Sequence, residues 1–180
     1  MYSGGKTVDR TTFRRPPQWW APKLSPFWVR FWKPLRHLIQ HRIQFLDKIE
    51  VRNLENLREA MTAGYGVLIT PNHSGHSDAI VLCRTAEELG MPYYFMSAWQ
   101  VFGRASWLRQ KIFQQHGCFS VDREGTDMQA FRQATDILKA SAHPLVIFPE
   151  GEVYHINERL TPFREGPAAM ALTAAKKAKR

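Results

Sequence analysis

Short uninterrupted apolar runs alternate along this chain with longer stretches in which apolar residues recur at helical spacing. Runs this short suit strands that are buried on both faces of a mostly parallel sheet. The strands that the pattern predicts cover residues 49–51, 66–71, 93–97, 118–121 and 145–148. The helices that it predicts cover residues 54–63, 79–89, 102–115, 127–140 and 164–180. This alternating order predicts an α/β fold, a mostly parallel sheet flanked by helices.

Residues that commonly begin and end helices support these boundaries. Asn53, Asp78 and Thr126 stand where an N-cap side chain accepts a hydrogen bond from the first turn of a helix. Gly90 and Gly117 follow two of the predicted helices, at the position where glycine often ends a helix. A chain of 180 residues is long enough to bury the core of one such domain.

The first part of the chain follows a different pattern. Residues 1–26 contain four prolines, and we expect an arm without regular structure that is flexible or lies on the surface. A short helix over 27–33 and an amphipathic helix over 34–46 follow it. The amphipathic helix has two interpretations, packing on the domain's own core and contact with a membrane.

Charge and tryptophan content favour a lipid surface as a partner. The net charge is +9, and residues 1–50 hold ten Lys and Arg against three Asp and Glu. The same segment holds four of the six tryptophans, and cations interleaved with tryptophan suit an anionic phospholipid surface. No apolar stretch is long enough to span a bilayer, and the first residues lack the apolar core of a signal peptide. We therefore expect a peripheral protein on the cytoplasmic face of a membrane. Nucleic acid is not an expected partner, because no nucleic-acid-binding motif accompanies the charge.

The candidate chemistry lies in two polar segments, each of which follows a predicted strand. Residues 72–78 read Asn-His-Ser-Gly-His-Ser-Asp, and residues 148–151 read Phe-Pro-Glu-Gly. Ligands of parallel α/β sheets bind outside the carboxyl ends of the strands, so both segments belong to the edge where chemistry is expected. A carboxylate of Asp78 that accepts the Nδ1–H of His73 would leave Nε2 free as a base. The structural alternative for the two residues alone is a loop histidine beside a helix-capping aspartate.

These segments resemble the motifs of the glycerolipid acyltransferases, which include lysophosphatidic acid and glycerol-3-phosphate acyltransferases. Asn72, His73 and Asp78 match a first motif of the form Asn-His-x-x-x-x-Asp. Residues 117–123, Gly-Cys-Phe-Ser-Val-Asp-Arg, match a second motif, and residues 148–151 match a third. Residues 163–169 resemble the family's segment that leads into the next helix, so the resemblance extends over about 45–175.

The resemblance implies acyl transfer from a thioester, acyl-CoA or acyl-carrier protein, to a hydroxyl of a lysophospholipid or glycerol phosphate acceptor. His73 would be the general base and Asp78 the residue that orients it. Because a thioester is already electrophilic, no enzyme nucleophile, metal ion or cofactor is expected. Arg123 would bind the acceptor's phosphate, and Glu150 would help to hold the acceptor. The residues implied in substrate binding are Asn72, Gly117, Arg123, Phe148, Pro149, Glu150 and Gly151.

Two departures from the family pattern affect these expectations. Glu152, Val153 and Tyr154 follow Gly151, where family members often have Thr or Ser and then Arg, so the acceptor's identity stays open. The family also continues beyond the position of Arg180 into another strand. We therefore expect a membrane-facing arm over 1–33 and an acyltransferase domain over 34–180 that lacks its C-terminal strand.

Three other functions remain as alternatives. The first is a catalytically inactive relative that still binds membranes. The second is a serine hydrolase, because Gly75-His76-Ser77-Asp78-Ala79 superficially resembles a nucleophile elbow. The third is a metal hydrolase that uses His73, His76 and Asp78 as ligands.

Overall fold

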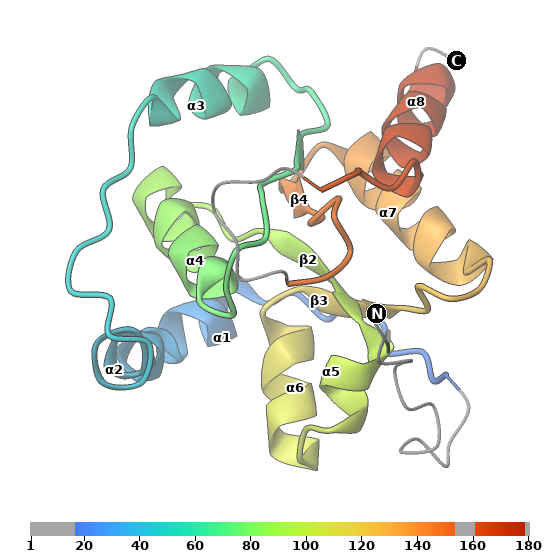
Figure 1. Cartoon of the computed structure of the whole chain (residues 1–180). Coiled ribbons are helices and arrows are strands. Elements are labelled where there is room, and N and C mark those ends of the chain that lie inside the picture. Colours follow the sequence, from blue (N-terminus) through green and yellow to red (C-terminus); the bar gives the residue numbers. More distant parts are fainter. Residues whose placement is uncertain (1–16, 154–160, 179–180) are drawn as a thin grey trace, which may run out of the picture.

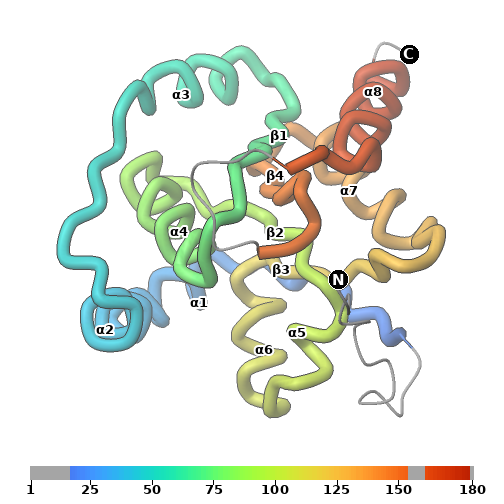
Figure 2. Tube along the Cα trace, viewed as in Figure 1, coloured from blue at the N-terminus to red at the C-terminus, as the bar shows by residue number. Residues whose placement is uncertain are grey.

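The computed structural model describes residues 17–153 and 161–178 and has the predicted α/β fold (Figures 1 and 2). Four strands of the described chain form one all-parallel sheet in the order β1-β4-β2-β3. They are β1 (Leu68–Ile69), β2 (Tyr94–Ala98), β3 (Cys118–Val121) and β4 (Leu145–Val146). The helices are α1 (Pro26–Phe31), α2 (Lys33–Arg42), α3 (Leu54–Thr62), α4 (Asp78–Leu89), α5 (Trp99–Gly103), α6 (Trp107–Gln115), α7 (Met128–Ala140) and α8 (Gly166–Ala178).

Helices cover both faces of the sheet, and the central strand β4 shows why. Successive side chains of a strand point to opposite faces. Helices α7 and α8 lie on one side of the sheet and α4 on the other (Figure 1). Leu145 and Ile147 are buried against α7 and α8, whereas Val146 between them is buried against α4. The fully apolar sequence of β4 therefore fits a strand that is enclosed on both sides.

Residues 17–25, the described part of the predicted arm, lie along the edge strand β3. The Trp20 amide donates to Ser120 Oγ at 2.8 Å, and the Ser120 amide donates to the Trp20 carbonyl at 3.1 Å. The Trp20 ring stacks on Phe102 with 5.3 Å between the ring centroids. This part of the arm thus lies on the surface of the domain. Residues 1–16 lie outside the described residues.

Helix α2 presents its polar side to the domain and its apolar side to the exterior. Arg36 and Gln40 are only 8% exposed, whereas Leu38 and Ile43 are 55% and 62% exposed. Of the two interpretations of the amphipathic helix, packing of its apolar side on the core is therefore wrong.

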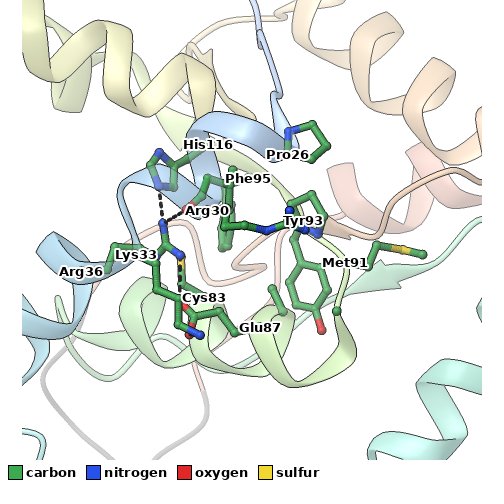
Figure 3. Close-up of a pocket in the computed structure, with 14 residues that line it drawn as sticks. Pro26, Arg30, Lys33, Arg36, Cys83, Glu87, Met91, Tyr93, Phe95 and His116 are labelled. Atoms are coloured by element: carbon green, nitrogen blue, oxygen red, sulfur yellow. Dashed lines mark hydrogen bonds and ion pairs between the residues drawn. The ribbon is translucent and has the colours of Figure 1, made fainter.

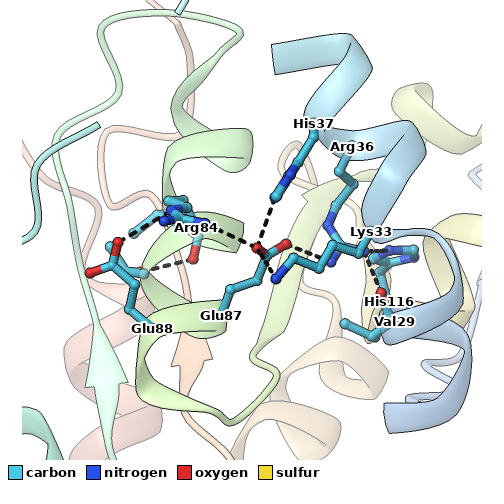
Figure 4. A network of polar contacts seen from close by, with 10 residues as sticks. Val29, Lys33, Arg36, His37, Arg84, Glu87, Glu88 and His116 are labelled. Atoms are coloured by element: carbon cyan, nitrogen blue, oxygen red, sulfur yellow. Dashed lines mark hydrogen bonds and ion pairs between the residues drawn. The ribbon is translucent and has the colours of Figure 1, made fainter. Parts of the chain in front are cut away.

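Glu87, in the last turn of α4, holds α2 in this orientation (Figure 4). Its carboxylate accepts hydrogen bonds from Arg36 Nη2 at 2.7 Å and from His37 Nε2 at 3.0 Å. It also lies 3.4 Å from Lys33 Nζ. Burial acts to raise the pKa of Glu87, but the hydrogen bonds from Arg36 and His37 hold this pKa below its ordinary value. Arg36 Nη1 also contacts His116 Nε2 at 2.7 Å, which ties α2 to the end of α6.

Several predicted boundaries differ from the structure. Residues 49–51 form no strand, because the segment between α2 and α3 runs outside α4, away from the sheet (Figure 1). The predicted helix over 102–115 is two helices, α5 and α6. Asn53 adopts a left-handed conformation, with φ of 56°, and its side chain makes no capping bond. The cap of α7 is Asp127 rather than Thr126, since the Asp127 side chain accepts the Ala130 amide.

Within the described ranges, no helix has the length and apolar character that a membrane-spanning segment requires.

Candidate active site

The topology of the sheet brings His73 next to Glu150. Strands β1 and β4 are parallel neighbours, so the loops that follow them leave from the same edge. The backbone amide of His73 donates to Glu150 Oε1 at 2.8 Å. The Thr161 hydroxyl donates to Glu150 Oε2 at 2.8 Å, and Glu150 is only 7% exposed. Each carboxylate oxygen thus accepts a hydrogen bond from the protein.

Asp78 fixes both the ring and the loop of His73. Its Oδ2 lies 2.9 Å from His73 Nδ1 and accepts the Gly75 amide at 3.0 Å. Asp78 is the first residue of α4, so a rigid element sets the position of the carboxylate. Because an ionised carboxylate only accepts hydrogen bonds, the proton of a neutral imidazole lies on Nδ1 and the lone pair on Nε2.

The imidazole ring of His73 packs on an aromatic ring and is partly exposed. The His73 ring stacks on Phe148 with centroids 3.9 Å apart and an interplanar angle of 19°. The His73 side chain is 19% exposed, and no hydrogen bond of the described residues uses its Nε2. Asp78 and Phe148 thus fix the orientation of the imidazole, and Nε2 has no hydrogen-bond partner among the described residues.

Two arginines lie beside the turn that follows β4. The Arg123 guanidinium donates to the Gly151 carbonyl, and Arg164 Nη1 donates to the Arg123 carbonyl at 3.1 Å. The Arg164 amide donates to the Pro149 carbonyl at 2.8 Å. Gly151 has φ of 77°, and a side chain there would collide with the Arg164 side chain. Glycine at this position thus permits the close approach of Arg164.

Arg164 was not among the site residues that the sequence predicted. The segment 163–169 resembled the family's own segment, but no role was assigned to its arginine. The sequence did contain one signal for it. No arginine follows Gly151, where family members often have one, and this missing cation pointed to an arginine from elsewhere in the chain.

The remaining predicted site residues divide into two groups. Asn72 is exposed beside His73, and Pro149 is buried beside Glu150, so both belong to the carboxyl edge. Gly117 does not, because it precedes β3 and lies at the amino edge of the sheet. A Cβ atom on Gly117 would lie 2.9 Å from the Tyr93 carbonyl, and its φ is 78°. The structure thus places Gly117 away from His73 and Glu150, and tight chain packing explains the glycine.

A cavity of about 200 Å³ lies at the amino edge (Figure 3). Arg36, Cys83, Glu87, Tyr93 and His116 are among its lining residues. Burial raises the pKa of the Cys83 thiol to about 11, so this thiol stays protonated at neutral pH. The cavity shares no residue with the His73 site.

The described residues contain no group of three or more His, Cys, Asp and Glu arranged to hold a metal ion. The metal-hydrolase alternative thus gains no support from this part of the chain.

The structure is thus that of an α/β protein in which a carboxylate orients an imidazole at the carboxyl edge of a parallel sheet. A family model described as Acyltransferase matches residues 48–178, and the chain therefore belongs to the glycerolipid acyltransferase family. Neither the curated proteins nor the solved structures give a match.

Proposed function

We propose that this protein is an O-acyltransferase that moves a fatty acyl group from a thioester to a hydroxyl of a glycerolipid precursor. The observation that carries the proposal is the 2.9 Å contact of His73 Nδ1 with Asp78, because it leaves Nε2 as the ring nitrogen that is not used by the carboxylate. A base in this arrangement contributes roughly 10²–10⁴-fold to a rate when it removes the proton of an attacking hydroxyl.

The reaction that these residues support has two steps. His73 Nε2 takes the proton of the acceptor hydroxyl while its oxygen attacks the thioester carbonyl carbon and forms a tetrahedral intermediate. The intermediate then expels the donor's thiolate, which receives the proton from the imidazolium. The new bond is an ester, and the donor leaves as a free thiol. Asp78 stabilises the imidazolium that forms between the two steps.

The acceptor that we propose carries a phosphate, as lysophosphatidic acid and glycerol phosphate do. Support comes from Arg123 and Arg164, which lie together beside Gly151. A guanidinium matches two oxygens of a phosphate, and two guanidinium groups would bind a dianion. Arg164 would supply the cation that is missing from the sequence directly after Gly151.

For Glu150 we propose a positioning role rather than the predicted direct hold on the acceptor. Both of its carboxylate oxygens accept hydrogen bonds from the protein, one of them from the His73 backbone. Glu150 would therefore set the position of the His73 loop relative to the turn after β4.

We further propose that the acceptor is reached at a phospholipid surface on the cytoplasmic face, with the first two helices in contact with it. Phe27 and Phe31 of α1 are 68% and 56% exposed, and the exposed side of α2 is apolar. Aromatic and aliphatic side chains beside cations such as Arg30 and Lys33 suit the headgroup region of an anionic bilayer.

The proposal is tested with purified protein, acyl-CoA or acyl-carrier protein as donor, and a panel of acceptors. The panel contains a lysophosphatidic acid, glycerol-3-phosphate and a monoacylglycerol without phosphate. We expect radioactive acyl incorporation into a phosphorylated acceptor, and its loss in His73→Ala. His76→Ala, in the same loop, is the matched control and should retain transfer. Vesicle binding without any transfer would instead favour the inactive relative, and near-normal turnover of His73→Ala would refute the role of the base.

A further inference from the structure

Helices α5 and α6 form a second surface whose apolar side chains face outward. Val101, Trp107 and Leu108 are 47%, 67% and 53% exposed. The inner side of the same pair is filled, because Phe102 is fully buried between Trp20 and Phe113. The exposed residues are therefore not needed to complete the core. We call Val101, Trp107, Leu108, Arg109 and Lys111 the α5–α6 surface.

The charges of the α5–α6 surface are of one sign. Arg109 and Lys111 are exposed, and neither belongs to a salt bridge within the described residues. Lys111 Nζ lies 3.8 Å from the centre of the Trp107 ring, so the cation packs on the face of the indole in a cation–π contact. From Leu89 to Val121 the sequence contains no acidic residue. The local charge thus complements an anionic partner.

The position of the surface relates it to the catalytic edge. Helix α5 begins directly after β2 ends (Figure 1). It therefore starts at the carboxyl edge, where the loops that contain His73 and Glu150 follow β1 and β4. At its other end, α6 is joined to the start of α1, because the Ser25 amide donates to the Gln115 carbonyl at 3.0 Å. The Trp32 indole also donates to Gln115 Oε1, at 3.3 Å. Helix α6 therefore ends at the amino edge, where the exposed aromatic residues of α1 lie.

We propose that the α5–α6 surface is a second contact with an anionic lipid bilayer. The inference deepens the proposed function and rests on it. Tryptophan and lysine side by side suit the headgroup region, where the ring lies among the lipids and the cation meets phosphate. A protein interface is depleted of lysine, so the pairing of Lys111 with Trp107 favours lipid over a protein partner. Two contacts, at α1 and along α5–α6, would lay this side of the domain on the membrane, with the carboxyl edge opening beside the lipid from which the acceptor comes.

The test measures flotation of the protein with vesicles, in the absence of thioester and acceptor. Vesicles of phosphatidylcholine alone are compared with vesicles that also contain phosphatidylglycerol. The double variant Trp107→Ser, Leu108→Ser should bind the anionic vesicles at least roughly tenfold more weakly than the unaltered chain. Leu172→Ser is the matched control, because Leu172 is 62% exposed on α8, and it should bind normally.

A charge variant keeps the test decisive where the double variant folds poorly. Lys111→Glu should weaken binding to the anionic vesicles severalfold with little effect on neutral ones, whereas Lys177→Glu on α8 should not. Equal binding of the double variant and the unaltered chain would overturn the proposal. So would a dimer in solution that the double variant converts to a monomer, since a second copy would then be the partner. Because no substrate is present, a failure of acyl transfer would not affect the result.

Discussion

Replacement of Glu150 tests whether this residue positions the His73 loop or takes part in the reaction itself. In Glu150→Ala, the His73 amide and the Thr161 hydroxyl each lose the carboxylate oxygen that accepts their hydrogen bond at 2.8 Å. Glu150 itself is only 7% exposed. Hydrogen bonds to charged groups contribute about 1.5–3 kcal/mol each, so the free energy of unfolding should fall by about 3–6 kcal/mol. That is a large part of the roughly 5–15 kcal/mol that stabilises a domain of ordinary size.

Glu150→Gln is the matched variant. Its amide oxygen can accept the His73 amide, and its amide nitrogen can donate to Thr161 Oγ1, so both contacts are kept in neutral form. The unfolding free energy should then fall by about 1–3 kcal/mol, and acyl transfer should stay within about tenfold of the unaltered chain.

Urea unfolding at equilibrium and initial rates of acyl transfer, measured on the same preparations, test this reasoning. Unchanged unfolding of Glu150→Ala would show that the carboxylate does not hold the loop. A stable Glu150→Gln with transfer as low as that of His73→Ala would show that the charge itself takes part in the chemistry, and the positioning role would be wrong.

Three further predictions concern the base, the phosphate and the α2–α6 contact. Asp78→Asn should lower kcat by about 10²–10⁴-fold with little change in KM, and an unchanged kcat would separate the carboxylate from the reaction. Arg123→Ala and Arg164→Ala should each raise KM for a phosphorylated acceptor roughly tenfold or more but not for an unphosphorylated one, and equal changes for both acceptors would indicate structural roles. Burial, with the Arg36 guanidinium nearby, lowers the pKa of His116 from 6.5 to about 4. The unfolded chain therefore binds a proton at this histidine first as the pH falls, so the contribution of His116 should lower the free energy of unfolding by about 3 kcal/mol between pH 6.5 and 4 and no further below. Urea unfolding across this range should show a flatter pH dependence for His116→Gln, and the same slope in both proteins would contradict the assignment.

Much of the α/β order could be predicted because strands enclosed on both faces carry continuous apolar runs. Leu145 to Ile147 illustrate this, since all three are buried. The predicted strand over 49–51 failed because a strand also needs a hydrogen-bonded neighbour, and local composition does not reveal one. The break between α5 and α6 was missed for a related reason. Phe102 and Phe113 share helical spacing with their neighbours, but they meet each other across two helices.

The pairing of His73 with Asp78 could be inferred from spacing and motif. The hydrogen bond from the His73 backbone to Glu150 could not, because it depends on β1 and β4 being neighbours in the sheet. The position of Gly117 at the amino edge was also hidden, because a motif does not say which edge its residues occupy. The orientation of α2 was equally hidden, since an amphipathic pattern does not say which side faces the domain.

The segment that lies along β3 has a practical consequence for any shortened form of the protein. Residues 17–25 shield the outer edge of β3. The indole rings of Trp19 and Trp20 cover Phe119 and Phe102. Unshielded edges and uncovered aromatic surface promote self-association. Trimming the tryptophan-rich start to obtain a better-behaved protein would therefore yield aggregates, and point changes on the outer sides of α1 and α2 are the safer route.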